Sequence, residues 1–161
     1  CNIFRSLPAS LLRHPNNLNK FMKLFLITFF ALCFIQTKAQ EISLFNSKGS
    51  AVAYIYTDDD DLTIYLWGGK PVAYISNNNI YGFNGKHLGW WVEGIIRDHE
   101  GDAVGATKEA TNMYTEYEPY KGYKEYKPYK SYKEYAPYKP YWSTSWSSTS
   151  FKMFLLEGID D

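Results

Sequence analysis

The side chains with the clearest chemical potential are gathered in one short part of the chain. His87 is followed by Asp98, His99 and Glu100, with Asp102 close behind. Two imidazoles and two carboxylates could share acid and base roles in a hydrolase, because proton transfer requires titratable side chains within hydrogen-bond reach. Imidazole and carboxylate groups are also metal ligands, so the same residues could hold an ion.

The sequence around these residues lacks the usual companions of such chemistry. It has no cysteine after residue 33 and no Gly-x-Ser-x-Gly motif that would mark a nucleophile. The acidic residues also lack the spacing of a calcium loop, and the Glu100-Gly101 dipeptide fits the tip of a turn. We therefore predict no catalytic residues, no metal site and no cofactor. A secreted hydrolase or toxin-like effector that uses the two histidines with Asp98 and Glu100 remains the alternative.

Three tryptophans are candidates for binding rather than catalysis. Trp67, Trp90 and Trp91 could stack on sugar rings or on a protein surface. Trp90 and Trp91 are consecutive on a predicted strand, so their side chains should point to opposite faces. The outward-facing ring is the better binding candidate. In the alternative, both rings pack under neighbouring hairpins or under the C-terminal segment.

Tyrosine stands at every third position from Tyr114 to Tyr141, in a nine-residue unit that repeats as EYEPYKGYK, EYKPYKSYK and EYAPYKPYW. A polyproline II helix has three residues per turn, so all these rings would line one side. The rings could stack and the lysines could bind anionic groups, which suggests an adhesive stripe with Tyr120, Tyr129 and Tyr138 as its candidate contacts. Residues 111–149 could instead be a disordered linker, or lie along an exposed edge of the β body.

A repeated pattern before the tyrosines predicts the elements that hold these side chains. Each copy has a short strand, an x-Gly dipeptide and a second strand, and three copies are 16 residues apart. Asn-Gly between apolar runs indicates a type I′ hairpin turn. The first copy lies 20 residues earlier, and the extra four match the aspartates at 58–61, which we interpret as a solvated loop or a loose cation site. The four dipeptides are Lys48-Gly49, Gly68-Gly69, Asn84-Gly85 and Glu100-Gly101.

Two neighbouring repeat positions predict how the hairpins pack. One position is always small and the position before it is always apolar, so strand alternation should send them to opposite faces. A small residue in every copy suggests close backbone approach around a shared axis. We predict an all-β, ring-like or barrel-like body over residues 41–110, with four hairpins about a pseudo-four-fold axis. The small residues are Ala53, Ala73, Gly89 and Gly105, preceded by Val52, Val72, Leu88 and Val104.

The string GFNGKHLGWWVEGIIRDHEGDAVG, preceded by LTIYLWGGKPVAYI, resembles the four-fold β-flower family. That family consists of secreted bacterial proteins whose domain arranges β-hairpins around a pseudo-four-fold axis. The resemblance covers roughly residues 41–108. It implies the fold and export, and it brings no catalytic or binding residues.

Residues 22–39 are typical of a signal peptide, with a basic start, an apolar run of 12 residues and small residues before a cleavage site at Ala39. The run is too short to span a bilayer, which needs about 20 residues. We predict a secreted, periplasmic or cell-surface protein with no membrane span after cleavage. Residues 1–21 precede the first methionine, and we interpret them as upstream sequence translated by mistake.

The remaining features concern the C-terminus and the charge. Ser150 could cap a short helix over residues 150–158, with Phe151, Phe154 and Leu155 on one face for docking on the hairpin body or on a partner. From Gln40 onward there are 12 basic and 17 acidic side chains, which argues against nucleic acid as a partner. We therefore predict a non-enzymatic binding or structural protein whose partner is a glycan, cell-wall material or a protein surface.

Overall fold

The computed structural model describes residues 41–159. The predicted signal peptide and the residues before it lie outside this described part. Within residues 41–159, no helix is long and apolar enough to cross a membrane.

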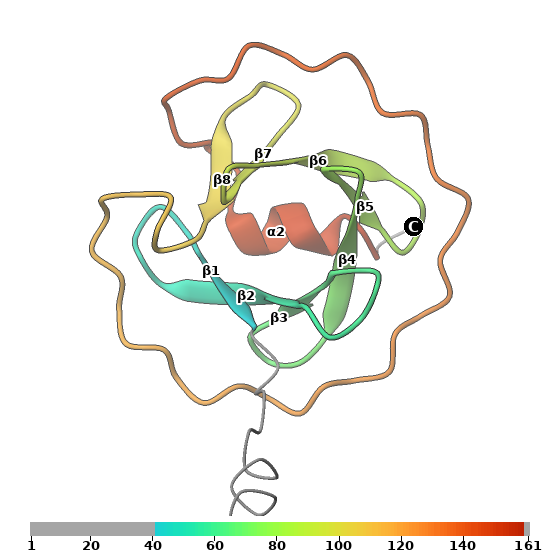
Figure 1. The fold of residues 1–161 in the computed structure, drawn as a ribbon, viewed down its shortest axis with the longest axis horizontal. Helices are drawn as coiled ribbons and strands as arrows, with labels where there is room; N and C mark the ends of the chain where they lie inside the picture. The colour runs from blue at the N-terminus through green and yellow to red at the C-terminus, as the bar shows by residue number, and fades with distance from the viewer. Residues whose placement is uncertain (1–40, 160–161) are drawn as a thin grey trace, which may run out of the picture. The chain divides into compact units, whose positions relative to one another are not determined.

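Eight antiparallel strands close into a barrel in which every strand pairs with its sequence neighbours and β8 pairs back with β1 (Figure 1). β-branched and aromatic residues dominate the strands, as expected for pleated, half-buried surfaces. The prediction of an all-β body made of four hairpins is confirmed. The strands are β1 (Ile42–Phe45), β2 (Ala51–Tyr56), β3 (Thr63–Leu66), β4 (Pro71–Ser76), β5 (Asn79–Gly82), β6 (His87–Val92), β7 (Ile95–Arg97) and β8 (Ala103–Ala106).

The hairpin turns differ from the predicted type I′. In the second hairpin the Gly69 N–H donates to the Leu66 carbonyl over 2.8 Å, and the Leu66 N–H donates to the Lys70 carbonyl over 2.8 Å. Only the glycine has a positive φ, 98° at Gly69. This is a type I turn followed by a left-handed glycine, which suits a loop longer than two residues. Positive φ at both residues occurs instead in the links between hairpins, at Asn77-Asn78 and Glu93-Gly94.

A β-bulge in each hairpin overturns the expected alternation. Ile64 pairs with Ala73 and Tyr65 pairs with Pro71, which leaves Val72 as an extra residue. The other three hairpins shift register at the equivalent place. A bulge re-aims side chains, so Val72 and Ala73 both belong to the interior cluster. The prediction that the small and apolar positions face opposite sides is therefore wrong.

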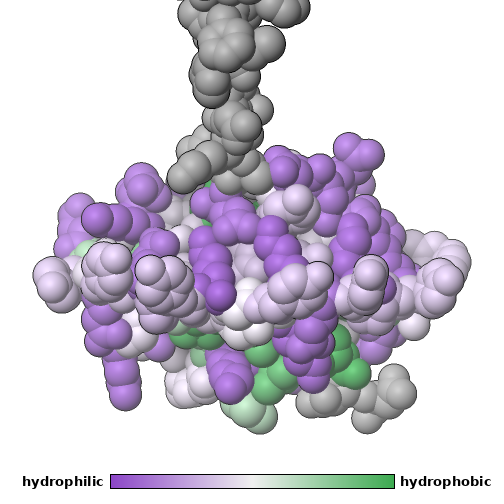
Figure 2. Space-filling view, turned by 90° about the horizontal axis from the view of Figure 1, so that it is seen from below, coloured by the Kyte–Doolittle hydropathy of each residue, from purple (hydrophilic) through white to green (hydrophobic). Residues whose placement is uncertain are grey.

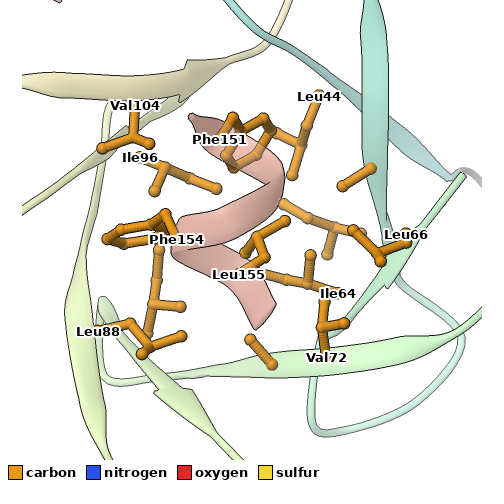
Figure 3. Close-up of a cluster of buried hydrophobic side chains, with 14 of the residues drawn as sticks. Leu44, Ile64, Leu66, Val72, Leu88, Ile96, Val104, Phe151, Phe154 and Leu155 are labelled. Atoms are coloured by element: carbon orange, nitrogen blue, oxygen red, sulfur yellow. The ribbon is translucent and has the colours of Figure 1, made fainter. Parts of the chain in front are cut away.

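The interior of the barrel is filled by helix α2 (Phe151–Leu156), which comes from the far end of the chain (Figures 1 and 3). The predicted short helix is confirmed, and Phe151, Phe154 and Leu155 are all buried, although the Ser150 side chain makes no capping hydrogen bond. A Cβ on Gly105 would overlap the Phe151 ring. A small residue at this repeat position therefore makes room for the helix, in addition to the close backbone approach predicted from the repeat.

Residues 111–149, which we call the belt, run around the outside of the barrel before the chain turns inward as α2 (Figure 1, orange). The belt has no helix or extended strand; its one isolated bridge joins Trp146 to Ala103. Of the interpretations given for this segment, the structure corresponds to an extended chain lying against the β body. A disordered linker is not what the structure shows.

Candidate functional site

The belt is tied to the barrel by backbone hydrogen bonds at regular intervals. Four belt N–H groups, each nine residues from the next, donate to the carbonyl of the glycine in each hairpin turn. One nine-residue unit is therefore the length of belt that connects one hairpin to the next. The donor and acceptor pairs are Glu116 to Gly49 (2.9 Å), Glu125 to Gly69 (3.0 Å), Glu134 to Gly85 (2.9 Å) and Ser143 to Gly101 (3.1 Å).

The three-residue period of the belt sorts its side chains by direction. All ten tyrosines point away from the barrel with 86–103% of their surface exposed, and Figure 2 shows pale rings projecting from the side of the molecule in view. Tyr120, Tyr129 and Tyr138 are among them, so the predicted one-sided stripe exists on the belt. We call this set the tyrosine rim. Its members are Tyr114, Tyr117, Tyr120, Tyr123, Tyr126, Tyr129, Tyr132, Tyr135, Tyr138 and Tyr141.

Four of the belt lysines point toward the barrel and pair with its acidic groups. Lys121 and Lys124 contact the Glu41 carboxylate at 2.8 and 2.6 Å. Burial favours the neutral form of Glu41, but hydrogen bonds from both ammonium groups outweigh it and lower the pKa of this carboxyl.

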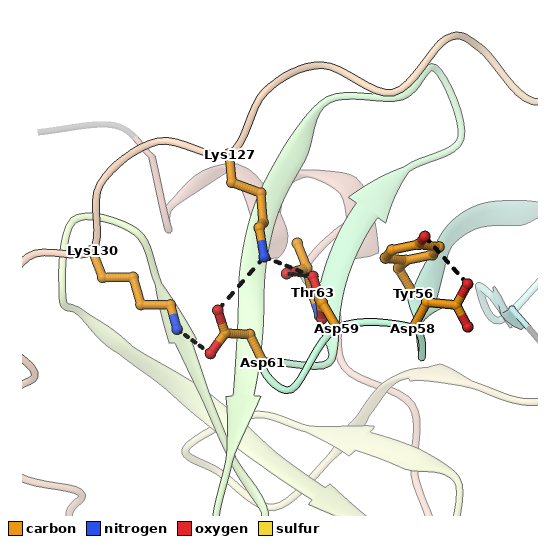
Figure 4. Close-up of polar contacts among 7 residues, drawn as sticks. All are labelled: Tyr56, Asp58, Asp59, Asp61, Thr63, Lys127 and Lys130. Carbon is orange, nitrogen blue, oxygen red and sulfur yellow. Dashed lines mark hydrogen bonds and ion pairs between the residues drawn. The ribbon is translucent and has the colours of Figure 1, made fainter. Parts of the chain in front are cut away.

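The aspartate run at residues 58–61 is the second of these docking points (Figure 4). Lys127 contacts Asp59 at 2.8 Å and Asp61 at 3.6 Å, and Lys130 also pairs with Asp61. The hydrogen bond from Lys130 lowers the pKa of Asp61. The run therefore binds the belt, and residues 41–159 contain no cluster of three or more side chains suited to hold a metal ion.

The same lysines also make cation–π contacts with aromatic rings on the outer face of the barrel. The Lys121 ammonium lies 4.8 Å from the Tyr54 ring centre and 4.9 Å from that of Trp67. Lys130 lies over Tyr74 at 4.3 Å. Such cation–π contacts stabilise a cation that is partly removed from water.

The last hairpin exchanges the two roles. Lys133 of the belt lies 5.3 Å from the centre of the Tyr81 ring on the barrel. One repeat later the barrel supplies the cation and the belt the ring, since Arg97 lies 5.6 Å from the centre of the Trp142 ring. The Arg97 guanidinium also donates to the Ser143 carbonyl over 2.7 Å. Each nine-residue unit of the belt therefore corresponds to one hairpin of the barrel, both in position and in the chemistry of the contact.

The three candidate tryptophans lie under or beside the belt. Trp67 is half-buried and its indole N–H donates to the Pro119 carbonyl over 3.1 Å. Trp90 faces outward but is only 1% exposed, because Trp142 packs on it with ring centres 5.7 Å apart. Trp91 is half-buried and packs against the interior cluster.

The two candidate histidines are in direct contact. His87 Nδ1 lies 2.9 Å from His99 Nε2, and His87 Nε2 lies 3.1 Å from Asn79 Oδ1. The Asn79 amide nitrogen donates to the Asn77 carbonyl over 2.9 Å, which directs its oxygen at His87. His87 therefore carries its proton on Nε2 and accepts one from His99. Burial, with a smaller contribution from His99, lowers the pKa of His87 to about 4.

The carboxylates proposed to assist the histidines have other roles. Asp98 Oδ1 accepts the N–H groups of Glu100 and Asp102 at 3.2 and 2.9 Å, so it holds the last hairpin turn. The carboxylate that approaches the histidine pair comes from the belt, where Glu134 accepts the His87 backbone N–H over 3.0 Å. Sequence reasoning missed this partner, and the signal that could have found it was the correspondence between the nine-residue and 16-residue repeats.

Comparison with known proteins identifies the family. The model of the 4-fold beta flower protein family matches residues 42–155. Searches of curated proteins and of solved structures gave no match. The matched range contains the barrel, the belt and most of α2, and so extends beyond the residues that carried the resemblance in the sequence. This chain belongs to the four-fold β-flower family.

Proposed function

We propose that this protein is a non-enzymatic binding or structural protein of the cell surface or extracellular space, and that the tyrosine rim is its contact surface. The observation that carries this proposal is the display of ten phenol rings, 86–103% exposed, on a backbone held at all four hairpins. Tyrosine combines a large apolar face with a polar hydroxyl, which makes it a favoured residue at interfaces. Burial in the barrel does not explain why these rings are tyrosines.

The chemistry of the rim restricts the partner. Lys121, Lys124, Lys127 and Lys130 are paired with carboxylates of the barrel, so these cations are not directed at a partner. The rim offers neutral rings and hydroxyls, which suit a glycan, cell-wall material or a protein surface better than an anionic polymer. This replaces the sequence-based idea that the belt lysines bind anionic groups.

Export is the second part of the proposal. The predicted signal peptide supports it, as does the absence of cysteine after residue 33, which leaves the exported part with no thiol to oxidise. The length of the apolar run favours release over retention as a membrane anchor.

The test is retention of the purified protein on insoluble glycans and cell-wall preparations. The variant Tyr120→Ser, Tyr129→Ser, Tyr138→Ser removes one exposed ring from each nine-residue unit, and we expect retention to fall several-fold. The matched control carries phenylalanine at the same positions and should retain most binding, since stacking faces remain. Equal retention of the serine variant and the unchanged protein would count against the rim. Deleting the chain from Asn112 is unsuitable, because it also removes α2 from the barrel.

A hydrolase built on the histidines has one observation in its favour, the 2.9 Å contact between His87 and His99. Against it, His87 is 2% exposed and both of its ring nitrogens have partners. Assays on peptide, ester and glycoside substrates, compared with His99→Ala, decide this alternative. Activity that disappears in the variant would support it, and no activity above the blank would remove it.

A further inference from the structure

We infer that the tyrosine rim binds the rim of a second copy of this chain. Each ring of one copy inserts between two rings of the other, so that several copies associate side by side around one barrel. This inference rests on the proposed function, because it assigns a partner to the same surface. Three features of the rim carry it: its distribution around the barrel, the spacing of its rings and the pairing of four belt lysines with the barrel.

The rim runs around the barrel instead of forming one patch. The belt backbone runs around the barrel and contacts the turn of every hairpin (Figure 1), so its exposed rings point outward in successive directions. A flat surface or a single glycan chain can touch one arc of such a convex rim and leaves the other rings in water. Several neighbours placed around the barrel would use all of them. Copies of the same chain supply neighbours with the matching surface.

The spacing of the rings fits another set of the same rings. Three residues of extended polyproline-like chain cover about 9 Å, at ~3.1 Å per residue. A ring inserted midway between two neighbours would lie about 5 Å from each, within the ~4.5–7 Å that aromatic pairs prefer between ring centres. Convex curvature spreads the ring tips and widens this gap slightly. Two rims can therefore interdigitate without moving either backbone.

The charges of the belt favour contact through neutral rings and predict an unusual salt response. Lys121, Lys124, Lys127 and Lys130 pair with carboxylates of the barrel, whereas Glu116 and Glu125 are exposed beside the rings, nine residues apart. Two rims that approach each other bring these acids together, and salt screens the repulsion. Association should therefore strengthen with added salt. By contrast, binding of an anionic polymer through lysines would weaken with added salt.

Each contact between two convex rims is small. Two or three rings from each copy bury less than the ~1,200 Å² at the lower limit of stable protein interfaces. A single pair is therefore weak, and larger assemblies form because each copy contacts several neighbours at once. The expected product is a population of associated species that grows with concentration, and not one stable dimer.

The test measures mass against concentration by sedimentation velocity, for the unchanged protein and two variants that carry either serine or phenylalanine at all ten rim positions. We expect the mass of the unchanged protein and of the phenylalanine variant to rise with concentration and with salt, and the serine variant to stay monomeric. Association outside the rim is the same in all three proteins, so their difference isolates the rim. A monomer at about millimolar concentration, or equal association of the serine variant, would overturn the inference.

A second measurement does not depend on the folding of a tenfold variant. Peroxidase with hydrogen peroxide joins two adjacent phenols by a carbon–carbon bond, each ring losing one hydrogen as the peroxide is reduced to two waters. In a mixture of isotope-labelled and unlabelled protein, we expect mixed-label dityrosine between rim residues. Coupling only within one chain would contradict side-by-side association. Loss of self-association with tyrosine-dependent glycan retention intact would overturn this inference and leave the proposed function standing.

Discussion

At the scale of single residues, His87 is the side chain whose chemistry its surroundings change most. Both ring nitrogens are engaged, by Asn79 and by His99, and the ring lies edge-on to Trp90 with centres 4.9 Å apart. A second proton would be placed on Nδ1, directly facing the N–H of His99. The site is therefore built for the neutral imidazole, which is a structural role and opposes use of His87 as a base.

The stability of the protein should consequently fall in mild acid. The pKa of His87 is lowered from its ordinary 6.5 to about 4 in the folded protein, so between these values the unfolded chain binds more protons. Stability is full above pH 6.5 and decreases as the pH falls towards 4, by on the order of 2 kcal/mol. Urea unfolding at a series of pH values measures this slope.

The control for this slope is His87→Gln, which does not titrate. We expect it to be less stable at pH 7 and nearly independent of pH in the same window. The lowered pKa values of Glu41, Asp59 and Asp61 add a loss of stability that begins as the pH approaches their ordinary values of 4.5 and 3.8, so the slope due to His87 is compared in the upper part of the window. An identical slope in the variant would show that another group titrates.

At the scale of elements, the four hairpins form the wall of the barrel, but they do not fill its interior. The bulges turn Val72 and its equivalents inward, and α2 supplies the apolar groups that they contact (Figure 3). A six-residue helix is marginal by itself in water, so the barrel and the helix stabilise each other.

Two neighbouring substitutions in α2 test this mutual dependence. Phe154 is 5% exposed and Met153 is 57% exposed. Phe154→Ala should destabilise the whole barrel by about 3–5 kcal/mol, because it leaves a cavity at the centre of the core. Met153→Ala should change stability by less than about 0.5 kcal/mol. Both are measured by denaturant unfolding with tryptophan fluorescence. Comparable effects of the two would mean that α2 does not contribute to the core.

At the scale of the whole molecule, residues 111–159 enclose and fill the barrel formed by residues 42–106. The belt holds the hairpin turns from outside while α2 packs inside, so the wall lies between two parts of the same C-terminal segment (Figure 1). The belt backbone lies directly against the hairpin glycines. A Cβ on Gly69 would overlap the Tyr123 carbonyl oxygen, and the same holds for Gly49, Gly85 and Gly101 with tyrosines nine residues apart.

Gly68 and Gly69 are neighbours in the second turn. Comparing alanine substitutions at the two positions distinguishes loss of the belt contact from the general effect of replacing a glycine. Gly69 has φ of 98° and touches the belt, whereas a Cβ on Gly68 would meet no atom within 4 Å. Gly69→Ala should cost about 2–3 kcal/mol through strain and displacement of the belt. Gly68→Ala should lie within about 0.5 kcal/mol of the unchanged protein. Hydrogen exchange at Glu125, which donates to the Gly69 carbonyl, should accelerate only in the first variant.

The sequence by itself determined the features whose energies are local. Strand alternation, turn glycines and the 16-residue period were sufficient for four hairpins, and the apolar spacing of Phe151, Phe154 and Leu155 was sufficient for a short helix. The three-residue period of the belt was sufficient for tyrosines on one side. Each depends on residues within one turn or one hairpin, where backbone geometry and side-chain direction are tightly coupled.

Only the tertiary structure decided where these pieces lie. The bulges that turn Val72 inward, the seat of α2 inside the barrel and the pairing of Lys121 with Glu41 join residues far apart in the chain. The local backbone preferences of the belt sequence are nearly the same whether the belt is free in solvent or bound around the barrel. The choice is made by hydrogen bonds, buried rings and ion pairs that exist only once the barrel has closed, and local sequence preferences do not include their energies.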